Sequence, residues 1–143
     1  ITYGDWSSDV CSSDLHWRRS EADVALYLTR VEDPRPFGLV PTDGDDRVLA
    51  FLEKPTTPEE IVTDQINAGC YVFRRRLLDD IPAGRPVSVE RETFPGLLST
   101  GAKVIGHVDT SYWLDLGTPL AFVRGSADLV RGLAPSPASR SHR

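Results

Sequence analysis

Cysteine is scarce in this sequence, which contains only Cys11 and Cys70. Two cysteines lack the density of a secreted disulfide scaffold. Together with three histidines at no metal-ligand spacing, they also argue against a zinc site. We therefore expect a cytoplasmic, reduced protein.

Long apolar runs and an excess of positive charge are missing as well. No segment approaches the ~20 apolar residues of a membrane helix, and no basic stretch leads into an apolar run at the N-terminus, so we expect neither a membrane span nor a signal peptide. The formal net charge of −5 argues against nucleic acid and membrane surfaces as partners, because both require a basic footprint. An anionic ligand would have to be held by a few placed cations.

The chain consists of three segments that differ in composition. Residues 1–15 are small and polar, contain the near-repeat Ser-Ser-Asp-Val and Ser-Ser-Asp-Leu, and show no helical or strand period. We interpret them as a non-native or disordered arm. Residues 132–143, rich in proline, serine and arginine, are interpreted as a disordered tail or a cut linker. Residues 16–131 between them form one partial domain.

Strands alternate with helices in this domain. Residues 23–31 are apolar on both faces, which predicts a buried strand. The other expected strands lie at 65–74, 103–109 and 112–116, and the expected helices at 75–81, 88–99 (capped by Ser88) and 119–131 (capped by Thr118). Residues 37–41 and 47–53 flank a turn rich in aspartate and glycine, which predicts an inserted antiparallel hairpin. The pattern indicates an α/β fold with a mixed sheet.

Four short motifs lie at or beside the ends of these strands. They are Phe-Gly-Leu-Val at 37–40, Phe-Leu-Glu-Lys-Pro at 51–55, Ile-Asn-Ala-Gly at 66–69 and Trp-Leu-Asp-Leu-Gly-Thr-Pro at 113–119. In this order and approximate spacing they resemble the sugar-1-phosphate nucleotidyltransferases, also called sugar-nucleotide pyrophosphorylases. The resemblance covers residues 16–131 and implies an enzyme with the C-terminal part of a Rossmann-like nucleotidyltransferase fold.

The pair Glu53 and Lys54 is the first candidate for chemistry. Pro55 cannot continue a strand ladder, so the pair stands at a strand end, where open α/β sheets bind ligands. Lysine suits a phosphate, and glutamate accepts hydrogen bonds from hydroxyl groups. Without the other motifs, the pair would be interpreted as two ordinary exposed side chains. The resemblance implies that Lys54 holds the sugar-1-phosphate and Glu53 the hexose.

Small residues mark two further candidate positions. Gly38 is either a strand irregularity or a place where the backbone approaches a ligand closely. Asn67 and Gly69 form either a turn before a strand or part of a pocket. The resemblance implies the second role in each case, so that Gly38, Asn67 and Gly69 line the sugar site.

Asp115 is the candidate metal ligand. It stands between two leucines, which predicts a half-buried carboxylate in need of a partner. The resemblance implies that Asp115 is one of two aspartates that hold Mg²⁺ between the phosphates of the two substrates, which agrees with the ligands Mg²⁺ prefers. Gly4-Asp5 imitates the other aspartate's motif but lies inside the atypical arm. Asp115 and Lys54 are thus the predicted catalytic residues.

The reaction that the resemblance implies is attack of a sugar-1-phosphate oxygen on the α-phosphate of an NTP, with pyrophosphate leaving. Positioning and charge neutralisation carry such chemistry. The glycine-rich G-x-G-T-R-L nucleotide loop of the family does not occur in the sequence, so we expect an N-terminally truncated and inactive chain. An exposed sheet edge would favour a homo-oligomer.

The choice of sugar and base depends on one stretch. Residues 85–95, Arg-Pro-Val-Ser-Val-Glu-Arg-Glu-Thr-Phe-Pro, resemble the mannose-1-phosphate guanylyltransferases within the family. This implies GTP and mannose-1-phosphate as substrates and GDP-mannose as product. Glucose-1-phosphate thymidylyl- or uridylyltransferases are the alternative, as is a non-catalytic, pyrophosphorylase-like regulatory subunit.

Overall fold

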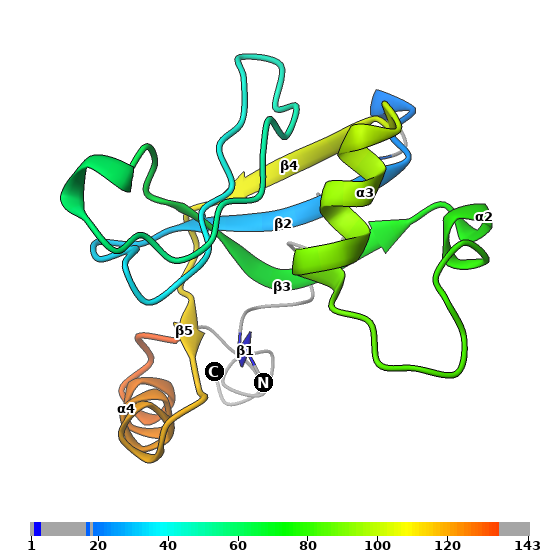
Figure 1. The fold of residues 1–143 in the computed structure, drawn as a ribbon. Helices are drawn as coiled ribbons and strands as arrows, with labels where there is room; N and C mark the ends of the chain where they lie inside the picture. The colour runs from blue at the N-terminus through cyan, green and yellow to red at the C-terminus, as the bar shows by residue number, and fades with distance from the viewer. Residues whose placement is uncertain (1, 4–16, 18, 135–143) are drawn as a thin grey trace.

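A three-stranded mixed sheet forms the centre of the computed structural model, which describes residues 2–3, 17 and 19–134. The strand order is β3-β2-β4 (Figure 1). Strand β2 (Val24–Arg30) runs antiparallel to β3 (Gln65–Phe73) and parallel to β4 (Val104–Asp109). The predicted α/β class with a mixed sheet is confirmed.

The central strand β2 is buried on both faces, as its apolar sequence predicts. Leu26 and Leu28 belong to the main core, whereas Ala25 packs with Ile105 on the other side. Helix α3 (Phe94–Ser99) lies across the main face and inserts Phe94 into the core (Figure 1).

The predicted hairpin pairs antiparallel, but its two arms are not regular strands. Leu39 and Leu52 exchange two backbone hydrogen bonds of 3.0 and 2.9 Å, and a second bridge joins Thr42 and Val48. Leu39 also bridges Ile66 of β3. The arms are thus held by isolated bridges to their neighbours and form no regular ladder.

The predicted helices are present but shorter or divided. Helix α2 (Arg75–Leu78) ends before the expected residue 81, and a 3-10 turn spans Pro58–Glu60. Residues 88–99 form a π-helical turn, η2 (Val89–Thr93), followed by α3. Pro95 has no N–H to donate to the carbonyl four residues earlier, which breaks the α-helical ladder there. The Ser88 hydroxyl accepts from the backbone N–H of Arg91 at 3.2 Å, so the expected cap is confirmed.

The last two elements stand apart from the main sheet (Figure 1). Strand β5 (Leu114–Asp115) pairs antiparallel with β1 (Thr2–Tyr3), and α4 spans Pro119–Val130. Thr118 caps α4 by accepting from the N–H of Ala121 at 3.1 Å, as expected. A Cβ on Gly125 of α4 would lie 2.8 Å from Leu116 Cδ2, so the missing side chain allows α4 to pack against the end of β5.

Much of the predicted arm and tail falls outside the described residues. Residues 2–3 of the arm are described and form β1; 1, 4–15 and 135–143 are not described, so the assignment of the arm and tail stays a prediction. Within 2–3, 17 and 19–134, no helix has the length and apolar character needed to cross a bilayer.

Replacing Gly106 of β4 with alanine is expected to lower the free energy of unfolding by about 1–3 kcal/mol. The new Cβ would lie 2.4 Å from Cδ1 of the buried Leu28 and 3.0 Å from Thr42 Cγ2, so the core would have to shift. Urea denaturation measures the change. Gly96→Ala is the matched control, since its Cβ meets nothing within 4 Å and alanine favours the helix by up to ~1 kcal/mol. Equal stability of the two variants would contradict the expectation.

Candidate functional site

Two adjoining cavities lie where the hairpin, β3 and η2 meet. The smaller has a volume of about 240 Å³, and its wall includes Gly38, Glu53, Lys54, Asn67, Glu90 and Arg91. The larger has a volume of about 760 Å³, and its wall includes Gly38, Lys54, Asn67, Glu90, Asp115 and Arg124. Every residue that the sequence predicted for the site, apart from Gly69, therefore lines at least one of the two cavities.

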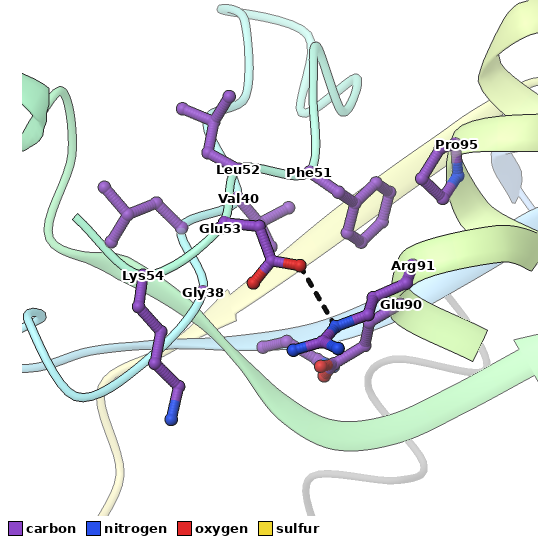
Figure 2. Close-up of a pocket in the computed structure, with 11 residues that line it drawn as sticks. Gly38, Val40, Phe51, Leu52, Glu53, Lys54, Glu90, Arg91 and Pro95 are labelled. Atoms are coloured by element: carbon purple, nitrogen blue, oxygen red, sulfur yellow. Dashed lines mark hydrogen bonds and ion pairs between the residues drawn. The ribbon is translucent and has the colours of Figure 1, made fainter. Parts of the chain in front are cut away.

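Gly38 lies where two backbone segments approach each other. A Cβ at this position would be 3.1 Å from the carbonyl oxygen of Leu52. This approach places Gly38 on the same wall as Glu53 and Lys54, which follow Leu52 directly (Figure 2). A larger residue would push the two segments apart and widen the cavity.

Lys54 differs from the other cations that line the cavities, which are Arg30, Arg91 and Arg124. Carboxylates engage those three: Asp64 pairs with Arg30, Glu53 with Arg91 (Nε–Oε1 3.1 Å) and Asp128 with Arg124 (Nε–Oδ2 3.8 Å). Among the described residues, the Lys54 ammonium has neither an ion pair nor a hydrogen bond. In Figure 2 its side chain extends away from the Glu53–Arg91 pair. Lys54 is thus the cation left free to bind an anion.

A bulge in β3 sets the position of Asn67. The pairing with β2 passes from Leu28↔Asn67 to Tyr27↔Cys70, which leaves Ala68 and Gly69 as two extra residues. Gly69 has φ = 83°, a left-handed conformation that glycine adopts without strain. Gly69 lines neither of the two cavities, so its contact with a sugar stays a prediction; the bulge is its observed contribution.

The Asn67 side chain is held by three hydrogen bonds. Its Oδ1 accepts from the N–H of Gly69 at 3.0 Å, and its Nδ2 donates to Tyr71 Oη at 2.6 Å and to Glu90 Oε1 at 2.5 Å. Burial raises the pKa of the Tyr71 phenol, and the hydrogen bond from Asn67 opposes the shift. Tyr71 stays a neutral hydroxyl, and both amide hydrogens of Asn67 are already used.

Asp115 is exposed, so the expectation of a half-buried carboxylate was wrong. The half-buried Leu114 and Leu116 both reach α4, where a Cβ on Gly125 would lie 3.3 and 2.8 Å from their Cδ2 atoms. Asp115 between them is left exposed on the wall of the larger cavity. Flanking leucines on a strand do not imply burial of the residue between them. Asp115 Oδ1 accepts from the N–H of Gly117 at 3.0 Å, which fixes the carboxylate.

The donor set at Asp115 fits Mg²⁺ only in part. No group of three or more His, Cys, Asp or Glu side chains that could hold a metal occurs among residues 2–3, 17 and 19–134. Mg²⁺ is commonly bound through one or two carboxylates together with substrate phosphates. Asp115 therefore fits a site that phosphate oxygens complete. Asp5 lies outside the described residues.

Glu90 and Arg91 also line the site, although the sequence reasoning did not place them there. Both belong to residues 85–95, the stretch that resembles the mannose-1-phosphate guanylyltransferases, and that resemblance was the signal that the sequence offered for them. The sequence could not show that η2 lies against the bulge of β3, because that contact joins segments more than 20 residues apart (Asn67–Glu90, separation 23).

Comparisons with known proteins agree with this architecture. Residues 13–132 match the family model described as nucleotidyl transferase. A mannose-1-phosphate guanylyltransferase from Mycobacterium tuberculosis is 66% identical over 131 residues, which are 91% of this chain and 35% of the relative. A mannose-1-phosphate guanyltransferase from Yarrowia lipolytica is 34% identical over 118 residues, 82% of this chain and 31% of the relative.

The crystal structure of HddC from Yersinia pseudotuberculosis has the same fold. It superposes with a TM-score of 0.67 at 20% identity and covers 90% of this chain and 52% of its own. The chain thus spans about a third of the length of the curated relatives that it matches, 35% for the Mycobacterium tuberculosis protein. The matched model and these identities together show that the chain belongs to the nucleotidyl transferase family.

Proposed function

We propose that this chain forms the sugar-1-phosphate side of a mannose-1-phosphate guanylyltransferase, which makes GDP-mannose and pyrophosphate from GTP and mannose-1-phosphate. The observation that carries the proposal is the Lys54 ammonium, which has no ion pair among the described residues and lies on the same cavity wall as Asp115. The 66% identity to the Mycobacterium tuberculosis relative supports the choice of sugar and base. A cytoplasmic location, inferred from the low cysteine content, belongs to the same proposal; self-association stays a prediction.

The residues of the site supply binding, orientation and charge. Lys54 would hold the phosphate of mannose-1-phosphate, and the nearby carboxylate of Glu53 would accept hydrogen bonds from the hexose. A phosphate oxygen then forms a bond to the α-phosphorus of GTP, and the bond between that phosphorus and the bridging oxygen of pyrophosphate breaks. Positioning dominates such a transfer, so no covalent protein group is needed.

Mg²⁺ fits the reaction as a group held by Asp115 together with phosphate oxygens. When bound, it neutralises phosphate charge during the transfer. The part of this chain in that binding is a fixed, exposed carboxylate at the wall of the larger cavity.

A chimera tests the proposal. Residues 17–134 replace the matching segment of the Mycobacterium tuberculosis relative, and product formation is measured with GTP and either mannose-1-phosphate or glucose-1-phosphate. We expect GDP-mannose to form in clear preference to GDP-glucose. The base preference would belong to the relative, so the sugar preference is the part that tests this chain.

The unmodified chain is the control for the chimera. We expect it to form no product, because it corresponds to only 35% of the length of that relative. A chimera that prefers glucose-1-phosphate would contradict the proposal in favour of a glucose-1-phosphate enzyme. A folded chimera that binds mannose-1-phosphate but makes no product would favour a regulatory subunit instead.

A further inference from the structure

Glu90 is the acidic side chain that lines both cavities. It extends from η2, where Figure 2 shows it next to Arg91 on the side of the cavity opposite Lys54. Its Oε1 accepts from Asn67 Nδ2 at 2.5 Å. Within the described part of the chain, its Oε2 has no hydrogen-bond partner. One carboxylate oxygen is therefore fixed by the protein and the other is left for a ligand.

The polar groups around the smaller cavity mostly accept hydrogen bonds. Glu53 and Glu90 are carboxylates, and Asn67 offers only its Oδ1 because both of its amide hydrogens are used. The guanidinium of Arg91 is paired with Glu53 at 3.1 Å. Such a wall suits a ligand with several hydroxyl donors and repels an anion. The anion must lie at the Lys54 end.

The size of this cavity suits a single sugar ring. Its volume of about 240 Å³ is below the ~300–1,000 Å³ of pockets for drug-sized ligands. Four residues, Gly38, Lys54, Asn67 and Glu90, line both cavities, so the two join there. Lys54 is the cation among these four. A hexose in the smaller cavity would therefore place its phosphate beside Lys54, with the larger cavity open beyond it.

We propose that Glu90 binds the hexose directly and helps to select it, with Oε2 accepting a hydrogen bond from a ring hydroxyl of the sugar phosphate. This inference rests on the proposed function and adds to it a residue that determines specificity. Arg91 contributes from the same turn as a positioning residue, because its ion pair directs the Glu53 carboxylate toward the same cavity. One turn of chain, η2, thereby controls both carboxylates that meet the sugar.

Glu90→Gln separates this binding role from a purely structural one. The carbonyl oxygen of glutamine can still accept from Asn67 Nδ2, so the link between η2 and the bulge is kept. The other position changes from an acceptor oxygen into an NH₂ donor, and the negative charge is removed. A residue that only supports the bulge would tolerate this change.

Calorimetric titration of the chain with mannose-1-phosphate and with inorganic phosphate tests the inference. We expect Glu90→Gln to weaken binding of mannose-1-phosphate by about tenfold or more, as for a lost hydrogen bond to a charged group, and to leave inorganic phosphate unaffected. Glu92→Gln is the matched control. Glu92 belongs to the same turn but pairs with Arg85 at 2.8 Å and lines a different cavity, so both affinities should stay unchanged.

Deoxygenated mannose-1-phosphates then identify the hydroxyl. The wild-type chain should bind one analogue more weakly than it binds mannose-1-phosphate. The Glu90→Gln variant should bind that analogue and mannose-1-phosphate with equal affinity. Unchanged affinity in Glu90→Gln would overturn the inference while the proposed function stands, and so would an equal loss in Glu92→Gln. A wild-type chain that binds inorganic phosphate but shows no preference for mannose-1-phosphate would overturn both.

Discussion

Lys54→Ala is expected to weaken binding of mannose-1-phosphate and of inorganic phosphate alike by about tenfold or more. Lys54 is exposed on the cavity wall. Loss of its hydrogen bond to a charged phosphate costs ~1.5–3 kcal/mol, and 1.4 kcal/mol is tenfold in affinity. Among the described residues, Lys54 is the cavity cation with no carboxylate partner, so no neighbouring cation can replace it without breaking an ion pair of its own. Calorimetry measures both affinities.

Lys103, the other lysine of the chain, provides the matched control. Its ammonium donates to the backbone carbonyl of Ser20 at 2.6 Å, and it lines neither of the two cavities of the site. Lys103→Ala removes the same charge and should leave both affinities unchanged. Full binding by Lys54→Ala, or an equal loss in Lys103→Ala, would show that phosphate binds elsewhere. The joint loss of both ligands also distinguishes this variant from Glu90→Gln.

Phe94→Ala is expected to lower the free energy of unfolding by about 3–5 kcal/mol. Phe94 is fully buried and stacks on Phe51 and Phe73, with ring centroids 4.7 and 5.8 Å away, while Tyr71 meets it edge-on at 5.0 Å. The loss is a large share of the ~5–15 kcal/mol that stabilises a typical domain. Urea denaturation followed by circular dichroism measures it.

We expect Phe94→Ala to disturb the candidate site as well as the core. Phe94 directly follows η2, and its partners Phe51 and Tyr71 are neighbours of Glu53 and Asn67 in space. Phe122→Ala on α4 is the control, because that ring is 62% exposed and its removal should change stability by no more than ~0.5 kcal/mol. If Phe94→Ala is unfolded, Phe94→Leu should fold with a smaller loss. A midpoint for Phe94→Leu equal to that of the wild type would contradict the role of this ring cluster.

The sequence predicted the central strand β2 well because burial on both faces leaves a simple signature. Residues 24–30 are apolar or small almost throughout, and the structure buries most of them. The hairpin was harder, since its arms share partners with β3 and β4 and form isolated bridges. Such sharing depends on contacts between distant segments, which local periodicity does not record.

The candidate site was predicted in outline and not in its electrostatics. The motifs at 37–40, 51–55, 66–69 and 113–119 do meet around two joined cavities. The sequence did not show which cation lacks a carboxylate partner. That depends on the carboxylates that pair with Arg30, Arg91 and Arg124, and these carboxylates lie in different parts of the chain. Asp115 failed as a burial prediction because the flanking leucines were taken to surround it, whereas they pack toward Gly125 of α4 and leave the carboxylate exposed.

The two extra residues of β3 have a consequence for how the pocket is encoded. In a regular strand, residues four apart are separated by about 13 Å, too far for an asparagine and a tyrosine side chain to meet comfortably; the extra length at Ala68 and Gly69 contracts the strand and lets Asn67 reach Tyr71 at 2.6 Å. Because the insertion is even, inward and outward positions keep their parity on either side of it. The alternation of β3 thus specifies its pairing in the sheet, while the number of extra residues in the bulge specifies the position of Asn67 on the cavity wall. That number can change by an even count without a change in the alternation.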